Sequence, residues 1–285
     1  MTIAACYVCP EGVVLGADST TTFEGGTIDG HPSHFNFSQK LFEVGEKASL
    51  GIVTWGRGGV GTASYRTMIA ELGEQLYYIG NFEVLQAASI WSEKFWASYD
   101  NAFPTEFARV RELAAKGNAI TVLEKEELMR LVNGTSVGFC IGGHGTWNRQ
   151  PRAFEVSYGP LADHAPVPTE IQIGRPRFWG WSNFIERLLF GLDQNIFDKI
   201  LASGKWNGTQ EELVQIVRDS SVSPPGFLPI REGIDWVYSS IYSTIKGFKF
   251  SRLDSVCGGP IEVAVITTDR RFRWVCHKEL DAALN

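Results

Sequence analysis

The second residue of the chain, Thr2, carries a hydroxyl whose chemistry changes once Met1 is removed. Its α-amine and its hydroxyl then belong to the same residue, so the amine can act as the base for the hydroxyl. An unperturbed α-amine has a pKa of roughly 7.7 to 8.0, near working pH. Such a pair gives a nucleophile without a separate histidine. The alternative is that Thr2 simply begins a β-strand, where threonine is common.

Two cysteines and two histidines near the N-terminus raise the question of a zinc site. Cys6 and Cys9 form a C-x-x-C pattern, and His31 and His34 follow. Zinc requires four ligands that converge on one point. The two cysteines lie in a strand pattern, where positions three apart face opposite sides. We therefore expect no metal site.

The glycine-rich stretch at residues 56–61 reads GRGGVG and matches the G-x-G-x-x-G pattern of dinucleotide-binding proteins. It follows a strand pattern and precedes a helical one, as such a site requires. The site also needs a second strand that ends in an acidic residue about 20 positions later. The sequence there keeps helical periodicity instead. We interpret the stretch as a flexible turn and expect no cofactor, with nicotinamide binding as the alternative.

Composition excludes several classes of protein. The chain has 285 residues, of which 20% are charged, and a formal net charge of -6 without a cluster of Lys and Arg. This argues against a nucleic-acid partner. No basic N-terminal signal and no apolar stretch long enough for a bilayer is present. The five scattered cysteines fit reduced thiols. We expect a cytoplasmic protein that does not bind membranes.

The elements that must position Thr2 follow from the periodicity. Strand patterns cover 3–9, 13–18, 40–44, 50–55, 136–142, 154–158, 261–269 and 271–278. Helical patterns cover 62–79, 83–99, two charged stretches at 108–117 and 124–134, then 182–192, 210–219 and 233–245. Strands and helices do not alternate strictly, as a parallel sheet would require. The pattern predicts an α+β fold: a four-layer αββα sandwich of two antiparallel sheets.

Five segments of the sequence resemble the β-type proteasome subunits and the related bacterial HslV peptidase. They are TIAACYVCPEGVVLGADS at the start, then SQKLFEV, GIVTWG, VGFCIGGHG and LDSVCGGPIEVAVIT, in the order found in that family. Among bacterial members, the length is most similar to the proteasome homologue of betaproteobacteria. The resemblance covers nearly the whole chain and implies the N-terminal-nucleophile (Ntn) hydrolase fold.

The resemblance also implies roles for individual residues. Thr2 is the nucleophile, and the Lys40 ammonium keeps its amine neutral. Asp18 holds Lys40 charged and oriented, the Gly56 N–H stabilises an oxyanion, and Asp254 helps to orient the N-terminal residue. Each has a structural alternative: Asp18 and Asp254 could cap a strand or loop, and Lys40 could be a solvated charge.

Some positions near these residues differ from the family, and others are expected only to line the substrate pocket. Cys257 stands where the family has Ser or Thr, and Gly180 or Ser182 stands in place of a serine in the family's Gly-Ser-Gly-Ser-like turn. Cysteine is a weak hydrogen-bonding group, so the tuning of the amine differs from that in the family. Thr22 and Thr54 are expected to line the substrate pocket.

We expect residues 1–285 to form one domain, with helical insertions at about 73–135 and 192–230 that exceed an ordinary β subunit. The aromatic residues of the helix at 83–99, among them Trp91 and Trp96, offer either a contact between rings of subunits or a core within one subunit.

The function that this sequence predicts is that of a self-compartmentalising threonine peptidase. It would cleave peptides or unfolded protein within a double ring of identical subunits, two stacked heptamers, with an ATP-dependent unfoldase as a possible partner. Two alternatives stay open: a non-catalytic ring subunit, and an Ntn amidohydrolase that acts on a small amide.

Overall fold

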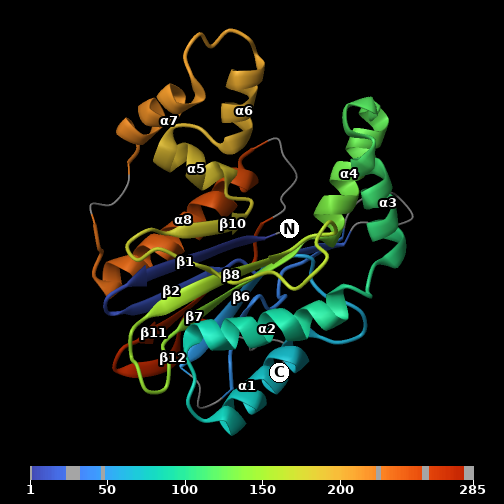
Figure 1. The fold of residues 1–285 in the computed structure, drawn as a ribbon. Helices are drawn as coiled ribbons and strands as arrows, with labels where there is room; N and C mark the ends of the chain where they lie inside the picture. The colour runs from blue at the N-terminus through green and yellow to red at the C-terminus, as the bar shows by residue number, and fades with distance from the viewer. Residues whose placement is uncertain (1, 24–32, 46–48, 223–225, 252–256, 279–285) are drawn as a thin grey trace.

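The computed structural model describes residues 2–23, 33–45, 49–222, 226–251 and 257–278 (Figure 1). These residues form two five-stranded sheets and a separate two-stranded hairpin, and all strand pairs are antiparallel. The first sheet has the order β10-β1-β2-β11-β12, and the second has the order β5-β6-β7-β8-β9. The predicted α+β sandwich of two antiparallel sheets is confirmed.

The strands of the first sheet are β1 (Ile3–Cys9), β2 (Gly12–Ala17), β10 (Arg177–Gly180), β11 (Glu262–Thr267) and β12 (Arg270–Cys276). Those of the second sheet are β5 (Leu41–Glu43), β6 (Leu50–Gly56), β7 (Val137–Gly143), β8 (Arg152–Tyr158) and β9 (Thr169–Glu170). The hairpin consists of β3 (Thr21–Phe23) and β4 (Ser33–Phe35).

The main helices cover the outer faces of the two sheets (Figure 1). They are α1 (Tyr65–Ile79) and α2 (Val84–Tyr99) on the second sheet, and α8 (Ile230–Lys249), with α5 (Asn183–Phe190) beside it, on the first. Further helices are α3 (Pro104–Ala115), the short 3-10 helix η1 (Gly117–Ala119), α4 (Val122–Thr135), α6 (Gln194–Ala202) and α7 (Gln210–Asp219).

Strand alternation in β1 shows why the sandwich has four layers. Ala4 and Cys6 belong to the apolar core between the two sheets, whereas Ile3, Ala5 and Tyr7 pack in the core beneath α8. Successive side chains of a strand point to opposite faces, so a strand buried on both faces is apolar throughout. All seven residues of β1 are buried.

The aromatic face of α2 forms the core within the subunit. Trp91 and Phe95 are fully buried and pack against Phe139 of β7, with ring centroids 4.8 and 4.7 Å from that ring. Trp96 packs against the edge of the same core. Of the two uses expected for these residues, the structure supports burial within the subunit.

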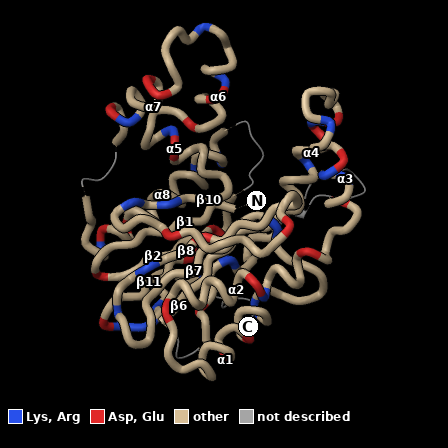
Figure 2. Tube along the Cα trace, in the orientation of Figure 1, with Lys and Arg blue, Asp and Glu red and all other residues tan. Residues whose placement is uncertain are grey.

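Two helical pairs extend away from the sandwich and carry many of the charged residues. Figure 1 shows α3 with α4 on one side and α6 with α7 on the other, within the two stretches expected as insertions. Figure 2 shows acidic and basic residues interspersed along them, and Arg109 of α3 contacts Glu127 of α4 at 2.8 Å. Among the described residues, no helix has both the length and the apolarity required to cross a bilayer.

Replacing Trp91 by alanine tests the α2 core. We expect Trp91→Ala to lower the free energy of unfolding by about 3–5 kcal/mol, because a large buried side chain leaves a cavity. Trp147→Ala is the control, since Trp147 lies in the segment after β7 and is 65% exposed. Equilibrium denaturation monitored by circular dichroism measures both. Equal midpoints for the two variants would contradict the packing described here.

Candidate functional site

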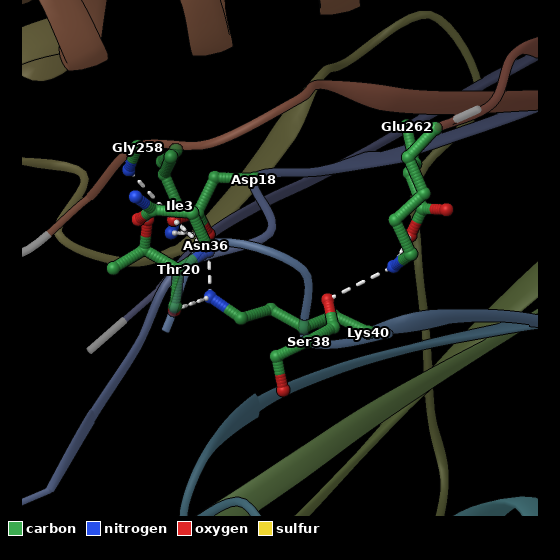
Figure 3. A network of polar contacts seen from close by, with 9 residues as sticks. Ile3, Asp18, Thr20, Asn36, Ser38, Lys40, Gly258 and Glu262 are labelled. Atoms are coloured by element: carbon green, nitrogen blue, oxygen red, sulfur yellow. Dashed lines mark hydrogen bonds and ion pairs between the residues drawn. The ribbon is translucent and has the colours of Figure 1, made fainter. Parts of the chain in front are cut away.

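The Asp18 carboxylate is the centre of the polar network drawn in Figure 3. It follows β2 and is fully buried. Its Oδ1 accepts the backbone N–H of Ile3 at 3.1 Å and lies 2.7 Å from Lys40 Nζ. Its Oδ2 accepts the N–H groups of Thr20 at 3.2 Å and Gly258 at 3.0 Å. Four donors therefore satisfy one carboxylate, as a buried charge requires.

Lys40, which precedes β5, is held on both its side chain and its backbone. Its side chain is 6% exposed, and Nζ donates to the Thr20 carbonyl at 2.5 Å as well as to Asp18. Its own carbonyl accepts the N–H of Thr54 at 2.9 Å. The structure thus brings together two predicted residues that are 22 positions apart.

Thr2 lies directly beside this charge pair. The nitrogen of Ile3, which is covalently bonded to the Thr2 carbonyl carbon, shares Asp18 Oδ1 with the Lys40 ammonium. The Thr2 carbonyl accepts the N–H of Trp181 at 2.8 Å, and Thr2 is 4% exposed. The backbone of Thr2 is therefore fixed next to a buried cation.

Gly180 lies against the Thr2 backbone, whereas Ser182 makes a different contact. Gly180 has φ +79°, and a Cβ at this position would approach the Thr2 carbonyl oxygen to 1.9 Å. Only glycine fits there. The Ser182 hydroxyl donates to Glu186 at 2.6 Å, within the first turn of α5. The described contacts therefore connect Gly180, but not Ser182, to Thr2.

Gly56 ends β6 in a conformation that also requires glycine. Its φ is +81°, and a Cβ would come within 2.5 Å of the Ser136 carbonyl oxygen. The preceding residue, Trp55, stacks on Trp179, with ring centroids 4.3 Å apart and an interplanar angle of 7°. Since Trp179 precedes Gly180, this stack joins the strands that end in the two candidate glycines. Sequence reasoning missed it, although each tryptophan stands immediately before a candidate glycine.

Cys257 lies in the segment before β11 and is buried. It is 1% exposed and packs in the core beneath α8 with Ile3. Burial raises its pKa, and the negative charge of Asp18 raises it further, while the Lys40 cation opposes this. The thiol is therefore neutral near pH 7 and sits within the field of the charge pair. Asp254 lies outside the described residues.

The two threonines expected at a substrate pocket stay predictions. The Thr54 hydroxyl donates to the carbonyl of Gly138 at 3.1 Å, and Thr54 is buried. Thr22 is half-buried in β3 and pairs with His34 in the register of the hairpin. Asn36 was missed by sequence reasoning: its Oδ1 accepts from the Thr20 hydroxyl at 2.9 Å, next to the charge pair.

The glycine-rich stretch does not lie in a dinucleotide-binding unit. β6 is antiparallel to both of its neighbours, β5 and β7. A dinucleotide site of this type needs a parallel strand on the other side of the helix. For the zinc alternative, His31 lies outside the described residues, and among those described no group of three or more His, Cys, Asp or Glu could hold a metal ion.

Removing the Asp18 charge tests the network. We expect Asp18→Asn to destabilise the protein by about 3–5 kcal/mol, because Lys40 would be left as a buried, unpaired charge and the new amide N–H2 would face donors. Asp269→Asn is the matched control, since that carboxylate is 72% exposed, and its stability should not change measurably. Urea denaturation measures both variants. A wild-type midpoint for Asp18→Asn would contradict a buried ion pair.

Comparisons with known proteins identify the fold alone. No family model and no curated protein matches the sequence. Anbu (ancestral beta-subunit) from Yersinia bercovieri has a TM-score of 0.50 and 14% identity, over 97% of this chain and 88% of that chain. An Anbu (Gly-1) mutant from Hyphomicrobium sp. strain MC1 has a TM-score of 0.49 and 14% identity, over 98% and 90%.

These findings correct the family predicted from the motifs. The prediction of a β-type or HslV-like protein, most like the betaproteobacterial proteasome homologue, is wrong, because the similar structure from Yersinia bercovieri is an Anbu protein, of a proteasome-like but distinct family. No sequence match supports the HslV assignment. What this chain shares with that Anbu protein is the fold alone, which is related to that of proteasome β-subunits.

Proposed function

We propose that the protein is a threonine peptidase of the N-terminal-nucleophile class, with Thr2 as nucleophile after removal of Met1. One observation carries the proposal: the buried Asp18–Lys40 pair is hydrogen-bonded to the Ile3 nitrogen, immediately beside Thr2. A buried cation at this place has a chemical use, because it lowers the pKa of a neighbouring amine.

In the proposed mechanism the Thr2 amine takes the proton of the Thr2 hydroxyl as Oγ1 attacks the peptide carbonyl. The Lys40 ammonium keeps that amine neutral and therefore basic, and Asp18 keeps Lys40 charged and in place. The Gly56 N–H donates to the oxyanion, an interaction typically worth about 3 kcal/mol. The amine returns its proton to the leaving amine, and water then hydrolyses the acyl ester. Asp254 stays a predicted orienting residue.

A second candidate function is that of a proteasome-like subunit without catalysis. The protonated Cys257 thiol favours it, because a thiol is a weaker hydrogen-bonding partner for the Thr2 amine than the hydroxyl that the family has at this position.

We further propose that the protein assembles with itself. The word "beta-subunit" in the description of the similar Anbu structure refers to a part of an assembly. Tyr77 and Tyr78 at the end of α1 have exposed rings, 64% and 86%, which suit a contact between subunits. The proposed assembly is a double ring of two stacked heptamers that encloses the Thr2 sites. Unfolded protein as substrate, an ATP-dependent unfoldase and a cytoplasmic location stay predictions.

Substitution of the nucleophile tests the activity. We expect Thr2→Ala to abolish peptide hydrolysis without changing the fold, because it removes the attacking hydroxyl. Thr2→Ser should keep part of the activity, since hydroxyl and amine remain while the methyl group that restricts χ1 is lost. Fluorogenic peptide turnover measures both, and intact mass shows whether Met1 has been removed. Full activity of Thr2→Ala would refute the mechanism, and inactivity of the processed wild type would favour the non-catalytic subunit.

Native mass spectrometry tests the assembly. We expect the mass of a closed double ring at micromolar concentration. Tyr77→Asp with Tyr78→Asp should lower the mass to smaller species, because charges placed in a subunit contact must be desolvated. A monomer or dimer of the wild type with full peptidase activity would contradict the enclosed chamber and leave the catalytic proposal intact.

A further inference from the structure

A buried carboxylate outside the proposed catalytic set lies at the start of β11. Glu262 is fully buried, and its Oε2 accepts from Lys278 Nζ at 3.2 Å. Its Oε1 lies 2.8 Å from His277 Nδ1, a contact of ion-pair distance but without hydrogen-bond geometry. Burial of a carboxylate is costly unless it is paired, so Lys278 is the partner that satisfies Glu262.

The same Lys278 ammonium makes a second contact that Glu262 does not require. Nζ donates to the carbonyl oxygen of Ser38 at 3.1 Å, across 240 positions of sequence (Figure 3). The Lys278 side chain is 14% exposed, so both contacts lie mostly away from water. An ammonium has three donors on one point and can bridge a carboxylate and a carbonyl at once.

Ser38 is thereby held from two sides, two residues before Lys40. Its N–H donates to the carbonyl of Ser19 at 3.0 Å, and Ser19 directly follows Asp18. Its carbonyl accepts from Lys278. The segment that leads into Lys40 is therefore fixed between the end of β2 and the residue that follows β12 by two positions.

We propose that Lys278 is a positioning residue that acts through Ser38 to hold Lys40 beside Thr2. The inference rests on the proposed function for the role of Lys40, but the mechanical link itself does not depend on catalysis. Glu262 fixes the Lys278 ammonium, Lys278 fixes the Ser38 carbonyl, and the short connection through Gln39 transmits this to Lys40.

The distance between the Lys40 ammonium and the Thr2 amine affects the pKa of that amine. Within the described part of the chain, the charged and titratable groups that lie next to Thr2 and Ile3 are Lys40, Asp18 and Cys257. If Lys40 moves away from the amine, its electrostatic effect weakens, and the pKa of the amine rises toward its ordinary value. The amine must be neutral to act as a base. As the solution is acidified, the variant would then lose activity at a higher pH than the wild type does. The acid limb of the pH–activity profile therefore shifts to higher pH.

The test uses three variants of the full-length protein and one control. Lys278→Met removes both contacts. Lys278→Arg keeps a cation that can bridge the same two acceptors. Lys278→Met combined with Glu262→Gln also removes the Glu262 carboxylate, which would otherwise be buried without its partner. The double variant therefore avoids the loss of stability but does not restore a donor to the Ser38 carbonyl. Lys94→Met is the control, because Lys94 pairs with Glu71 at 2.8 Å on the surface of the molecule.

Two measurements are made on each folded variant. The first is amide hydrogen exchange at Ser38, whose N–H donates to Ser19, and at Thr54, whose N–H donates to the Lys40 carbonyl. The second is kcat and KM for a fluorogenic peptide across pH. In Lys278→Met we expect exchange at both amides to be at least about tenfold faster. We expect kcat to fall about 10- to 100-fold, with KM unchanged and the acid limb moved upward.

The variants separate positioning from stability. We expect the double variant to recover thermal stability but to keep the fast amide exchange and the shifted acid limb. Lys278→Arg should restore both the wild-type exchange and the wild-type pH profile. Lys94→Met should match the wild type in every measurement. Wild-type exchange at Ser38 and Thr54 in Lys278→Met would overturn the proposal, as would a double variant that regains wild-type exchange and pH profile. If the wild type has no Thr2-dependent activity, the proposed function fails, and hydrogen exchange alone still decides the role of Lys278.

Discussion

The buried ion pair between Asp18 and Lys40 is the interaction on which the surroundings of Thr2 depend. Removing two charges from water is costly, and the pair is tolerated because Asp18 also accepts three backbone N–H groups. Those donors come from the first strand, from the turn after β2 and from the segment before β11. The carboxylate therefore joins parts of the chain that are far apart in sequence, and each of them must be in place for the charge to be buried.

The sandwich gives this pair its location. Thr2 and Asp18 stand at the same end of the paired strands β1 and β2, because the register sets Ala4 opposite Ala17. Lys40 arrives from the second sheet, where β5 pairs with β6. The stacked rings of Trp55 and Trp179 fill the space between the sheets at this end. The packing of the two sheets and the hydrogen-bonded segment at Ser38 therefore together set the separation of the groups.

Local signals predicted much of the fold but not the contacts between distant segments. The helix predicted at 210–219 has the same bounds in the structure, where Thr209 and Glu212 form a capping box at its start. β10 was missed, since its four residues have too short a pattern for strand alternation. α6 was missed because its two turns lie in a stretch interpreted only as an insertion.

The same limit applies to the candidate site. Asp18, Lys40 and Gly180 could be selected from motifs, and the structure places all three around the Thr2 backbone. The motifs also suggested a kinship that the comparisons correct, because short matches report a shared fold more reliably than a particular family. Lys278 could not be selected, since a single lysine near the end of a chain carries no signal until folding brings it to Ser38.

The order of strands in the first sheet has a consequence for synthesis on the ribosome. Among the described strands β1 is made before the others, yet it pairs with β10, and β2 pairs with β11, where Glu262 lies opposite Ala17 although the two are far apart in the chain. The Gly258 N–H that completes the cradle of Asp18 is translated 240 residues after it. Asp18 and Lys40 are therefore both made well before the Gly258 N–H that Asp18 accepts, so the buried pair can be completely satisfied only after the segment at Gly258 has been made.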